Sequence, residues 1–149
     1  MSTRLSQIIK GGIKMPCACA TTANITLSGL QTIDGYVTLE GDRVLVKNQT
    51  ATTENGIYVA SATAWERATD WNAENDAING MLVLDANDST AVYRVTFTGT
   101  FVLGTTVCTF TDINAAFVAD ATAQAVAAAA SAAAALVSEN NAETAETNA

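Results

Sequence analysis

The chain has 149 residues, of which 49% are hydrophobic, and this length suits one compact domain better than two full-sized ones. Seven lysines and arginines stand against fifteen aspartates and glutamates, so the formal net charge is −8, and there is no histidine. The charge balance argues against binding to nucleic acid or to an anionic membrane, since both need clustered cations. The lack of imidazole excludes Ser-His and Cys-His catalytic pairs as well as imidazole metal ligands.

The first segment, residues 1–16, is a polar arm that ends at the only proline of the chain. It lacks the basic start and continuous apolar run of a secretory signal. We predict that this extended arm adds a strand to an exposed sheet edge of a neighbouring protein. Ile8 and Ile9 would be its apolar anchors, and Lys10 and Lys14 its charges. The alternative is an unstructured terminus.

The second segment, residues 17–113, predicts a β-rich body. Short β-branched runs alternate with turn residues, of which Asp34-Gly35 is the strongest tight-turn pair. The connections are too short and polar for the helices of parallel βαβ units. We therefore expect a mainly β fold with a small antiparallel, sandwich-like body. The expected strands are residues 25–27, 30–33, 36–39, 43–47, 57–60, 81–84, 92–98 and 106–111.

The cysteines of the body predict buried thiols and no metal. On an extended segment the side chains of Cys17 and Cys19 would point to one side, where a metal could use them. A structural zinc site needs four nitrogen or sulfur ligands, however, and Cys108 is the only other candidate. We interpret all three as small buried hydrophobic residues, and we expect no cofactor.

Most carboxylates of the body stand beside Gly, Asn or Thr, where they bond the backbone of turns. The alternative, a glycosidase pair, needs two of them to face each other across a cleft. The alternation from Asp70 to Asp76 resembles a calcium loop, but its glycine and closing glutamate are misplaced, so we interpret it as a loop. We find no catalytic constellation and predict a binding or structural protein, not an enzyme. The carboxylates considered are Asp34, Asp42, Glu54, Asp70, Asp76, Asp85 and Asp88.

The two tryptophans are predicted to close the core of the body. The alternative for Trp65, which precedes Glu66-Arg67, is an anchor in an interface.

The third segment, residues 114–138, predicts a helix that associates with copies of itself. Fourteen of its 25 residues are alanine, the strongest helix former, and small side chains let helices approach closely. Heptad-like spacing of two sets of residues suits a parallel, multi-stranded coiled coil. The alternative is a single helix with a frayed end. We expect the oligomer contacts at Phe117, Val118, Ala125 and Leu136.

The same segment is uncharged over a long stretch, but alanine is close to neutral in a bilayer, and we interpret it as a soluble helix. The fourth segment, residues 139–149, is acidic and almost without apolar residues, and we expect it to be disordered in isolation.

Several motifs occur in an order that resembles a known module. They are the run from Cys19 to Gly35, then Gly41-Asp42-Arg43-Val44-Leu45-Val46-Lys47-Asn48-Gln49-Thr50, Glu54-Asn55-Gly56-Ile57-Tyr58-Val59 and Trp65-Glu66-Arg67-Ala68-Thr69-Asp70. With later turns at Asn79-Gly80 and Gly104-Thr105, the series resembles a module near the N-termini of tail fibres and minor tail structural proteins of tailed bacteriophages.

The resemblance implies a virion structural protein, assembled in the bacterial cytoplasm and carried on the phage tail. It implies a homotrimer whose body is anchored to other tail proteins, such as the tail tube, an adaptor or a nozzle, and which anchors a host-recognition fibre. It leaves open whether the chain is a complete adaptor or the first part of a longer fibre. The alternatives are a capsid decoration protein or head fibre and, with less support, a protein that binds or depolymerises host glycans.

Overall fold

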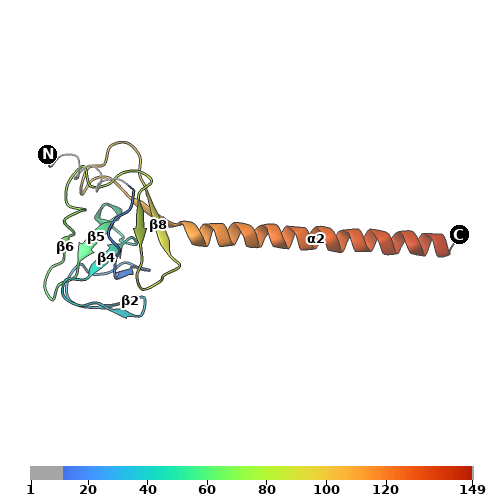
Figure 1. Cartoon of the computed structure of the whole chain (residues 1–149), viewed down its shortest axis with the longest axis horizontal. Helices are drawn as coiled ribbons and strands as arrows, with labels where there is room; N and C mark the ends of the chain where they lie inside the picture. The colour runs from blue at the N-terminus through green and yellow to red at the C-terminus, as the bar shows by residue number, and fades with distance from the viewer. Residues whose placement is uncertain (1–11, 149) are drawn as a thin grey trace. The chain divides into compact units, whose positions relative to one another are not determined.

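The structure is a computed structural model that describes residues 12–148. This part of the chain divides at residue 113 into two compact units, a β-rich body and a long C-terminal helix. The described part of the body has short strands and one 3-10 helix (Figure 1). They are β1 (Cys19–Ala20), β2 (Thr32–Ile33), β3 (Tyr36–Val37), β4 (Arg43–Val46), η1 (Thr52–Glu54), β5 (Gly56–Val59), β6 (Glu66–Arg67), β7 (Leu82–Leu84), β8 (Val92–Thr96) and β9 (Thr109–Asp112).

The strands form a four-stranded sheet in the order β1-β4-β5-β6, a three-stranded sheet in the order β7-β8-β9 and the β2–β3 hairpin. In Figure 1, β4 and β5 lie in the middle of the body. The turn of the hairpin is the predicted Asp34-Gly35 pair, and the positive φ angles of both residues, 49° and 78°, are those that such a tight turn requires.

The four-stranded sheet is buried on both faces because β4 and β5 carry apolar side chains on each. Val44 and Val46 point to one face, and Leu45 between them points to the other. In the paired strand, Tyr58 lies opposite Val44 and Ile57 opposite Leu45, and each shares its partner's face. A strand buried on both sides needs a continuous apolar run, which is why the sequence predicted β4 so clearly.

The two faces belong to two separate apolar clusters. The first core joins the four-stranded sheet to the three-stranded sheet, and the second core joins it to the β2–β3 hairpin. The buried members of the first core are Cys17, Ala20, Leu45, Ile57, Ala68, Trp71, Ala77, Met81, Val83, Val95, Phe101 and Cys108. Those of the second core are Cys19, Ile33, Val44, Val46, Tyr58, Ala60 and Trp65. Both tryptophans therefore close the core, as predicted.

Residues 12–17, which we expected in a separate arm, lie along β7 instead. The Leu82 N–H donates to the Gly12 carbonyl (2.7 Å), the Lys14 N–H donates to the Leu82 carbonyl (2.8 Å), and the Cys17 N–H donates to the Leu84 carbonyl (2.9 Å). The arm boundary at residue 16 is therefore wrong, because the described end of the segment belongs to the body.

After a bend at Ala18, the chain crosses from the three-stranded to the four-stranded sheet, where β1 pairs with β4. This pairing is parallel, as are the bridges of Ile13 to Leu82 and of Cys17 to Asp85. The expectation of a wholly antiparallel body is therefore wrong. The mainly β description fits the body, while the chain as a whole combines mixed sheets with one long helix.

The predicted strand at residues 25–27 is a loop. The Gln49 side chain satisfies the backbone of Ile25, accepting from its N–H (2.9 Å) and donating to its carbonyl (3.0 Å). The Thr50 N–H in turn donates to the Asn24 side chain (2.7 Å). The backbone groups that a strand would pair are thus bonded to amide side chains, which the β-branched pattern alone does not reveal.

Gly56 begins β5 at a point where a side chain has no room. Arg67 and Trp71 occupy the position that its Cβ would take. The Arg67 guanidinium is fixed there because it donates to the carbonyls of Asn55 (3.0 Å) and Thr53 (3.1 Å). The glycine in this motif is therefore required by the close approach of two side chains from the following strand and loop.

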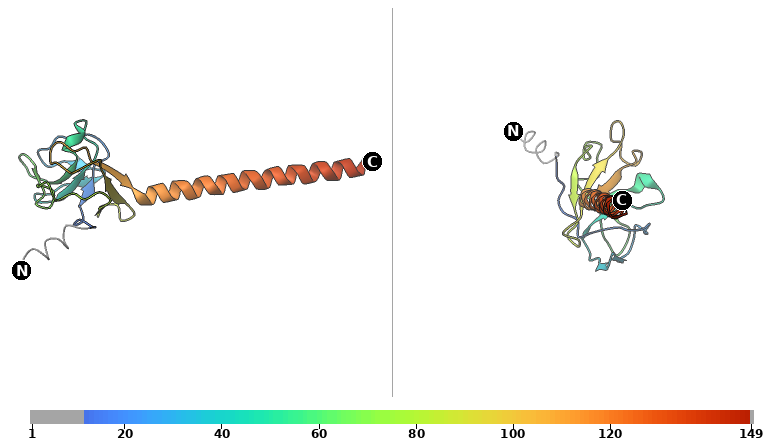
Figure 2. Two further views of the ribbon diagram at one scale, coloured as in Figure 1. Left: turned by 90° about the horizontal axis from the view of Figure 1, so that it is seen from above. Right: turned by 90° about the vertical axis from the view of Figure 1, so that its right-hand side faces the viewer.

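The C-terminal unit is the helix α2 (Ile113–Thr147), 35 residues long and about 52 Å in length at 1.5 Å per residue. It is straight and uninterrupted (Figures 1 and 2). It continues well past Ser138, into the segment 139–149 that we expected to be disordered in isolation. Extending an existing helix avoids the cost of nucleation, and the Thr144 hydroxyl bonds the carbonyl of Asn140 (2.8 Å).

The packing around Gly56 gives a stability prediction. Gly56→Ala is expected to lower the free energy of unfolding by about 2–4 kcal/mol, because Arg67 and Trp71 must move. Gly35→Ala is the control: its φ is also positive, but nothing lies near its Cβ, so about 1–2 kcal/mol is expected. Urea unfolding followed by tryptophan fluorescence measures both, and equal losses would contradict the packing argument.

Candidate functional site

Four of the seven carboxylates considered bond the backbone of turns, as the sequence predicted. The Asp42 carboxylate accepts from the Leu39 N–H (2.7 Å), and that of Asp85 accepts from the Asn87 N–H (2.9 Å). The turn role is confirmed for Asp42, Asp76, Asp85 and Asp88.

Two of these carboxyl groups have shifted acidities with opposite causes. Bonds from the Thr90 hydroxyl and N–H hold the pKa of Asp88 below its usual value. Burial raises the pKa of Asp85, although two backbone N–H groups act in the other direction. Both shifts follow from local turn structure and burial.

Asp70 has a different role, which is to hold residues 14–15 against the body. Its carboxylate makes a bidentate pair with the Arg43 guanidinium at 2.9 and 3.0 Å. Arg43 also donates to the Met15 carbonyl (3.3 Å), and the Lys14 ammonium donates to the Asp70 carbonyl (2.5 Å) and lies 5.9 Å from the centre of the Trp71 ring. We call these four side chains, Lys14, Arg43, Asp70 and Trp71, the N-terminal clasp.

The clasp corrects the role predicted for Lys14. Only 5% of Lys14 is exposed, so its charge is used within the body and does not face a partner. Ile8, Ile9 and Lys10, the other predicted arm contacts, lie outside the described residues.

The cysteines are free and buried, but they do not form a pair. Cys17 belongs to the first core and Cys19 to the second, because the bend at Ala18 breaks the alternation that would have put both on one side. Burial raises the pKa of both thiols to about 12 and that of Cys108 to about 11. At neutral pH all three are protonated and therefore poor nucleophiles.

Within residues 12–148, no group of three or more Cys, Asp or Glu side chains is arranged to hold a metal ion. In the segment that resembles a calcium loop, the Asp76 carboxylate accepts from the N–H groups of Asn72 (3.0 Å) and Ala73 (2.8 Å). This segment is a loop closed by one of its own side chains, as we interpreted it.

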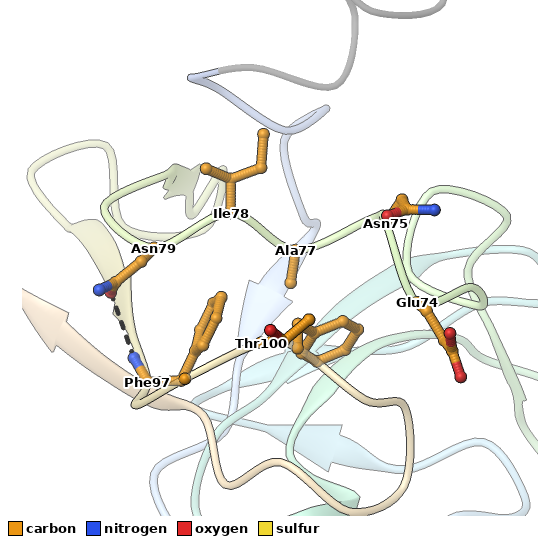
Figure 3. Close-up of a pocket in the computed structure, with 9 residues that line it drawn as sticks. Glu74, Asn75, Ala77, Ile78, Asn79, Phe97 and Thr100 are labelled. Carbon is orange, nitrogen blue, oxygen red and sulfur yellow. Dashed lines mark hydrogen bonds between the residues drawn. The ribbon is translucent and has the colours of Figure 1, made fainter.

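A shallow hollow of about 740 Å³ lies between residues 74–79 and residues 97–101. Ala77 points toward the segment that carries Phe97 and Thr100, whereas Ile78 points away from it (Figure 3). The Asn79 side chain accepts from the Phe97 N–H (3.2 Å) and fixes the two segments to each other. Among the lining residues, all of which are described, Glu74 alone is ionisable, so the hollow has no acid–base pair.

Several of the large apolar side chains that are exposed in the described part of the chain lie on α2. The predicted contacts Phe117, Val118 and Leu136 are 71%, 66% and 60% exposed, and Ala125 is exposed as well. Val118 and Leu136 stand about five helical turns apart and share one face. Phe117 lies on a different face from Val118 and Leu136. It shares that face with Gln124, about two helical turns further along α2.

By length and composition, α2 is also long and apolar enough to cross a membrane, with a mean hydropathy of 1.5 over its most apolar window. A single helix that passes this test is weak evidence of a membrane protein.

Sequence reasoning missed two features of this surface. It did not place Arg43 and Asp70 together, since they are separated by 27 positions and each stands in a separate motif. It also missed the exposed pair Ile13 and Met15, because their alternation with Lys14 predicts the opposite orientation, with the lysine exposed.

No protein-family model, curated protein or solved structure matches this chain.

Burial of the thiols gives a chemical prediction. At pH 8 the native protein is expected not to react with an aromatic disulfide reagent, whereas all three thiols react after unfolding in guanidinium. A Val37→Cys variant is the control, because residue 37 is 63% exposed and its thiol should react at once. Fast labelling of Cys17 or Cys19 in the native protein would contradict the buried assignment.

Proposed function

We propose that this chain is a non-enzymatic structural protein of a phage tail, in which the body is held by other tail proteins and α2 joins copies of the chain into a trimer. The observation that carries the proposal is a helix of 35 residues of which none of the described ones is buried. A helix so rich in alanine is only marginally stable alone in water. Contact with copies of itself gives its apolar side chains a partner.

The arrangement of polar residues along α2 supports one face as the contact. Gln124, Ser131 and Ser138 recur every seven residues and form a polar stripe, and Phe117 falls on the same stripe. Thr122, Ala129 and Leu136 recur at the same interval on the opposite side, flanked by Val118 and Ala125. We place the contact between helices on this second set, and we leave out Phe117.

The body supports the tail assignment through the motifs that resemble the phage module. These motifs supply strands of the four-stranded sheet and contacts that stabilise it. The Gln49 side chain bonds the backbone of Ile25, and the missing side chain of Gly56 leaves room for Arg67 and Trp71. The resemblance therefore rests on residues with structural roles that belong together in space. In the proposal, this resemblance is what assigns the chain to the tail.

One observation favours a second candidate, a membrane-spanning role for α2, because its length and hydropathy are sufficient. This role would place Gln124 and Ser131 within hydrocarbon, along with Asp120 if the span starts early. Flotation of the purified chain with neutral phosphatidylcholine vesicles tests it. Flotation with the vesicles would favour the membrane role, and protein that stays at the bottom of the gradient would favour the tail role.

Association through α2 gives a direct prediction. The wild-type chain is expected to sediment at three times its mass, and Leu136→Lys to shift it toward monomer because a charge would enter the helix contact. Ser138→Lys adds the same charge on the polar stripe and is the control, with little change expected. Sedimentation equilibrium gives the mass and circular dichroism gives the helix content. A monomeric wild-type chain at high concentration would overturn the trimer.

The place on the particle is tested by imaging. Gold-labelled antibodies against the body, applied to particles that contain the chain, are expected to decorate the tail. Labels spread over the capsid would instead support the decoration-protein alternative.

A further inference from the structure

The three-stranded sheet has a second face, opposite the first core, that carries apolar side chains. Val83 and Val95 point into the first core, so their neighbours in each strand point to the other side. The same holds for residues 12–17, where Lys14 is buried against Trp71 while Ile13 is 61% and Met15 68% exposed. We call Ile13, Met15, Leu82, Leu84 and Val92 the outer patch.

The register of the strands makes the outer patch continuous. Ile13 bridges to Leu82 in the adjacent strand, and Leu84 lies directly opposite Val92. Adjacent strands are about 4.8 Å apart, and alternate residues of one strand are about 7 Å apart, so Ile13 and Leu82, and Leu84 and Val92, are neighbours on this face. Met15 follows Ile13 in the direction in which Leu84 follows Leu82, because the two segments are parallel.

Connectivity indicates which partner reaches this face. β9 ends at Asp112 and α2 begins at Ile113, so no linker separates the three-stranded sheet from the helix. If the helices associate as proposed above, the copies of this sheet are held close to one another. The body of a partner copy is then present at high effective concentration.

Energetics and charge support the same partner. An alanine side chain buries a single methyl group, so an alanine-rich helix contact supplies little apolar area per residue. The Ile, Met and Leu side chains of the outer patch each supply more apolar area to a contact than an alanine does. The copies carry −8 each, but the outer patch has no carboxylate, and the residue across the strand from Leu82 is the exposed Arg94. Copies can therefore meet at this face without carboxylate repulsion.

We infer that the outer patch is the body's part of the interface between copies of this chain. The inference rests on the proposed trimer and adds to it a second contact, separate from the helix. In the assembled protein the patch is covered by a neighbouring copy.

The test compares two double variants of the full-length chain by sedimentation equilibrium over a concentration series. Ile13→Glu with Met15→Glu is expected to weaken association at least roughly thirtyfold, since two exposed apolar contacts are replaced by charges. Val37→Glu with Leu39→Glu is the matched control. Val37 in β3 is 63% exposed and Leu39, two residues further on, is 61% exposed; neither belongs to the outer patch, and no change is expected. Tryptophan fluorescence reports that the body of each variant is folded.

The outcomes separate this inference from the proposed function. A wild-type trimer that Leu136→Lys dissociates but the Ile13, Met15 variant does not would overturn the outer patch and leave the helix contact standing. A monomeric wild-type chain would overturn both.

A photo-crosslinking amino acid at position 15 identifies the occupant directly, in a mixture of unlabelled and ¹⁵N-labelled chains. Products that join a light chain to a heavy one are expected. Products confined to one chain, between position 15 and residues 1–11, would overturn the inference, since the chain's own arm would then cover the patch.

Discussion

The body depends on the N-terminal clasp, because the segment that it holds is the one that joins the two sheets at their edges. Residues 12–17 lie along β7, and two residues later β1 lies along β4. Strands of two to five residues have few ladder hydrogen bonds, so their stability comes from the packing of both sheets on the first core. Arg43 and Asp70 fix the crossing segment to the four-stranded sheet, and Lys14 fixes it above Trp71.

A buried ammonium group is destabilising unless it is paired, and the fold meets this requirement with the Asp70 carbonyl and the face of Trp71. This arrangement also explains why sequence reasoning placed Lys14 on the surface. In a two-residue alternation, Ile13 and Met15 read as the buried pair and Lys14 as the exposed one, and the structure has the reverse. Only the position of Trp71, far away in sequence, makes the inward lysine possible.

The parts of the fold that could be predicted are those set by local chemistry. The apolar run of β4 and the Asp34-Gly35 turn need only their own residues. The loop at Ile25 could not be predicted, because its hydrogen bonds come from Gln49. The end of α2 was also missed, since composition suggests disorder for residues 139–147 whereas a preceding helix favours continuation. The exposed positions of Val118 and Leu136 could be predicted from their heptad-like spacing. The exposure of Ile13 and Met15 could not, because it depends on how the fold buries Lys14.

The motifs that resemble the phage module turn out to be fold-defining. Within the body, the side chains of Gln49, Asn55 and Arg67 make hydrogen bonds to the backbone, which fix loops. Gly56 allows two side chains to pack closely against the backbone. Residues of this kind can be shared by proteins with different partners, so function has to be argued from the exposed surfaces. Large apolar side chains are exposed on α2 and, at Ile13 and Met15, on the outer patch, and the chain passes directly from β9 into α2. In the proposed trimer a methyl-rich helix contact supplies little apolar area per residue and the copies repel at −8 each, so a second contact on the body would strengthen the association. Because the two proposed contacts belong to one chain, formation of one would raise the effective concentration for the other.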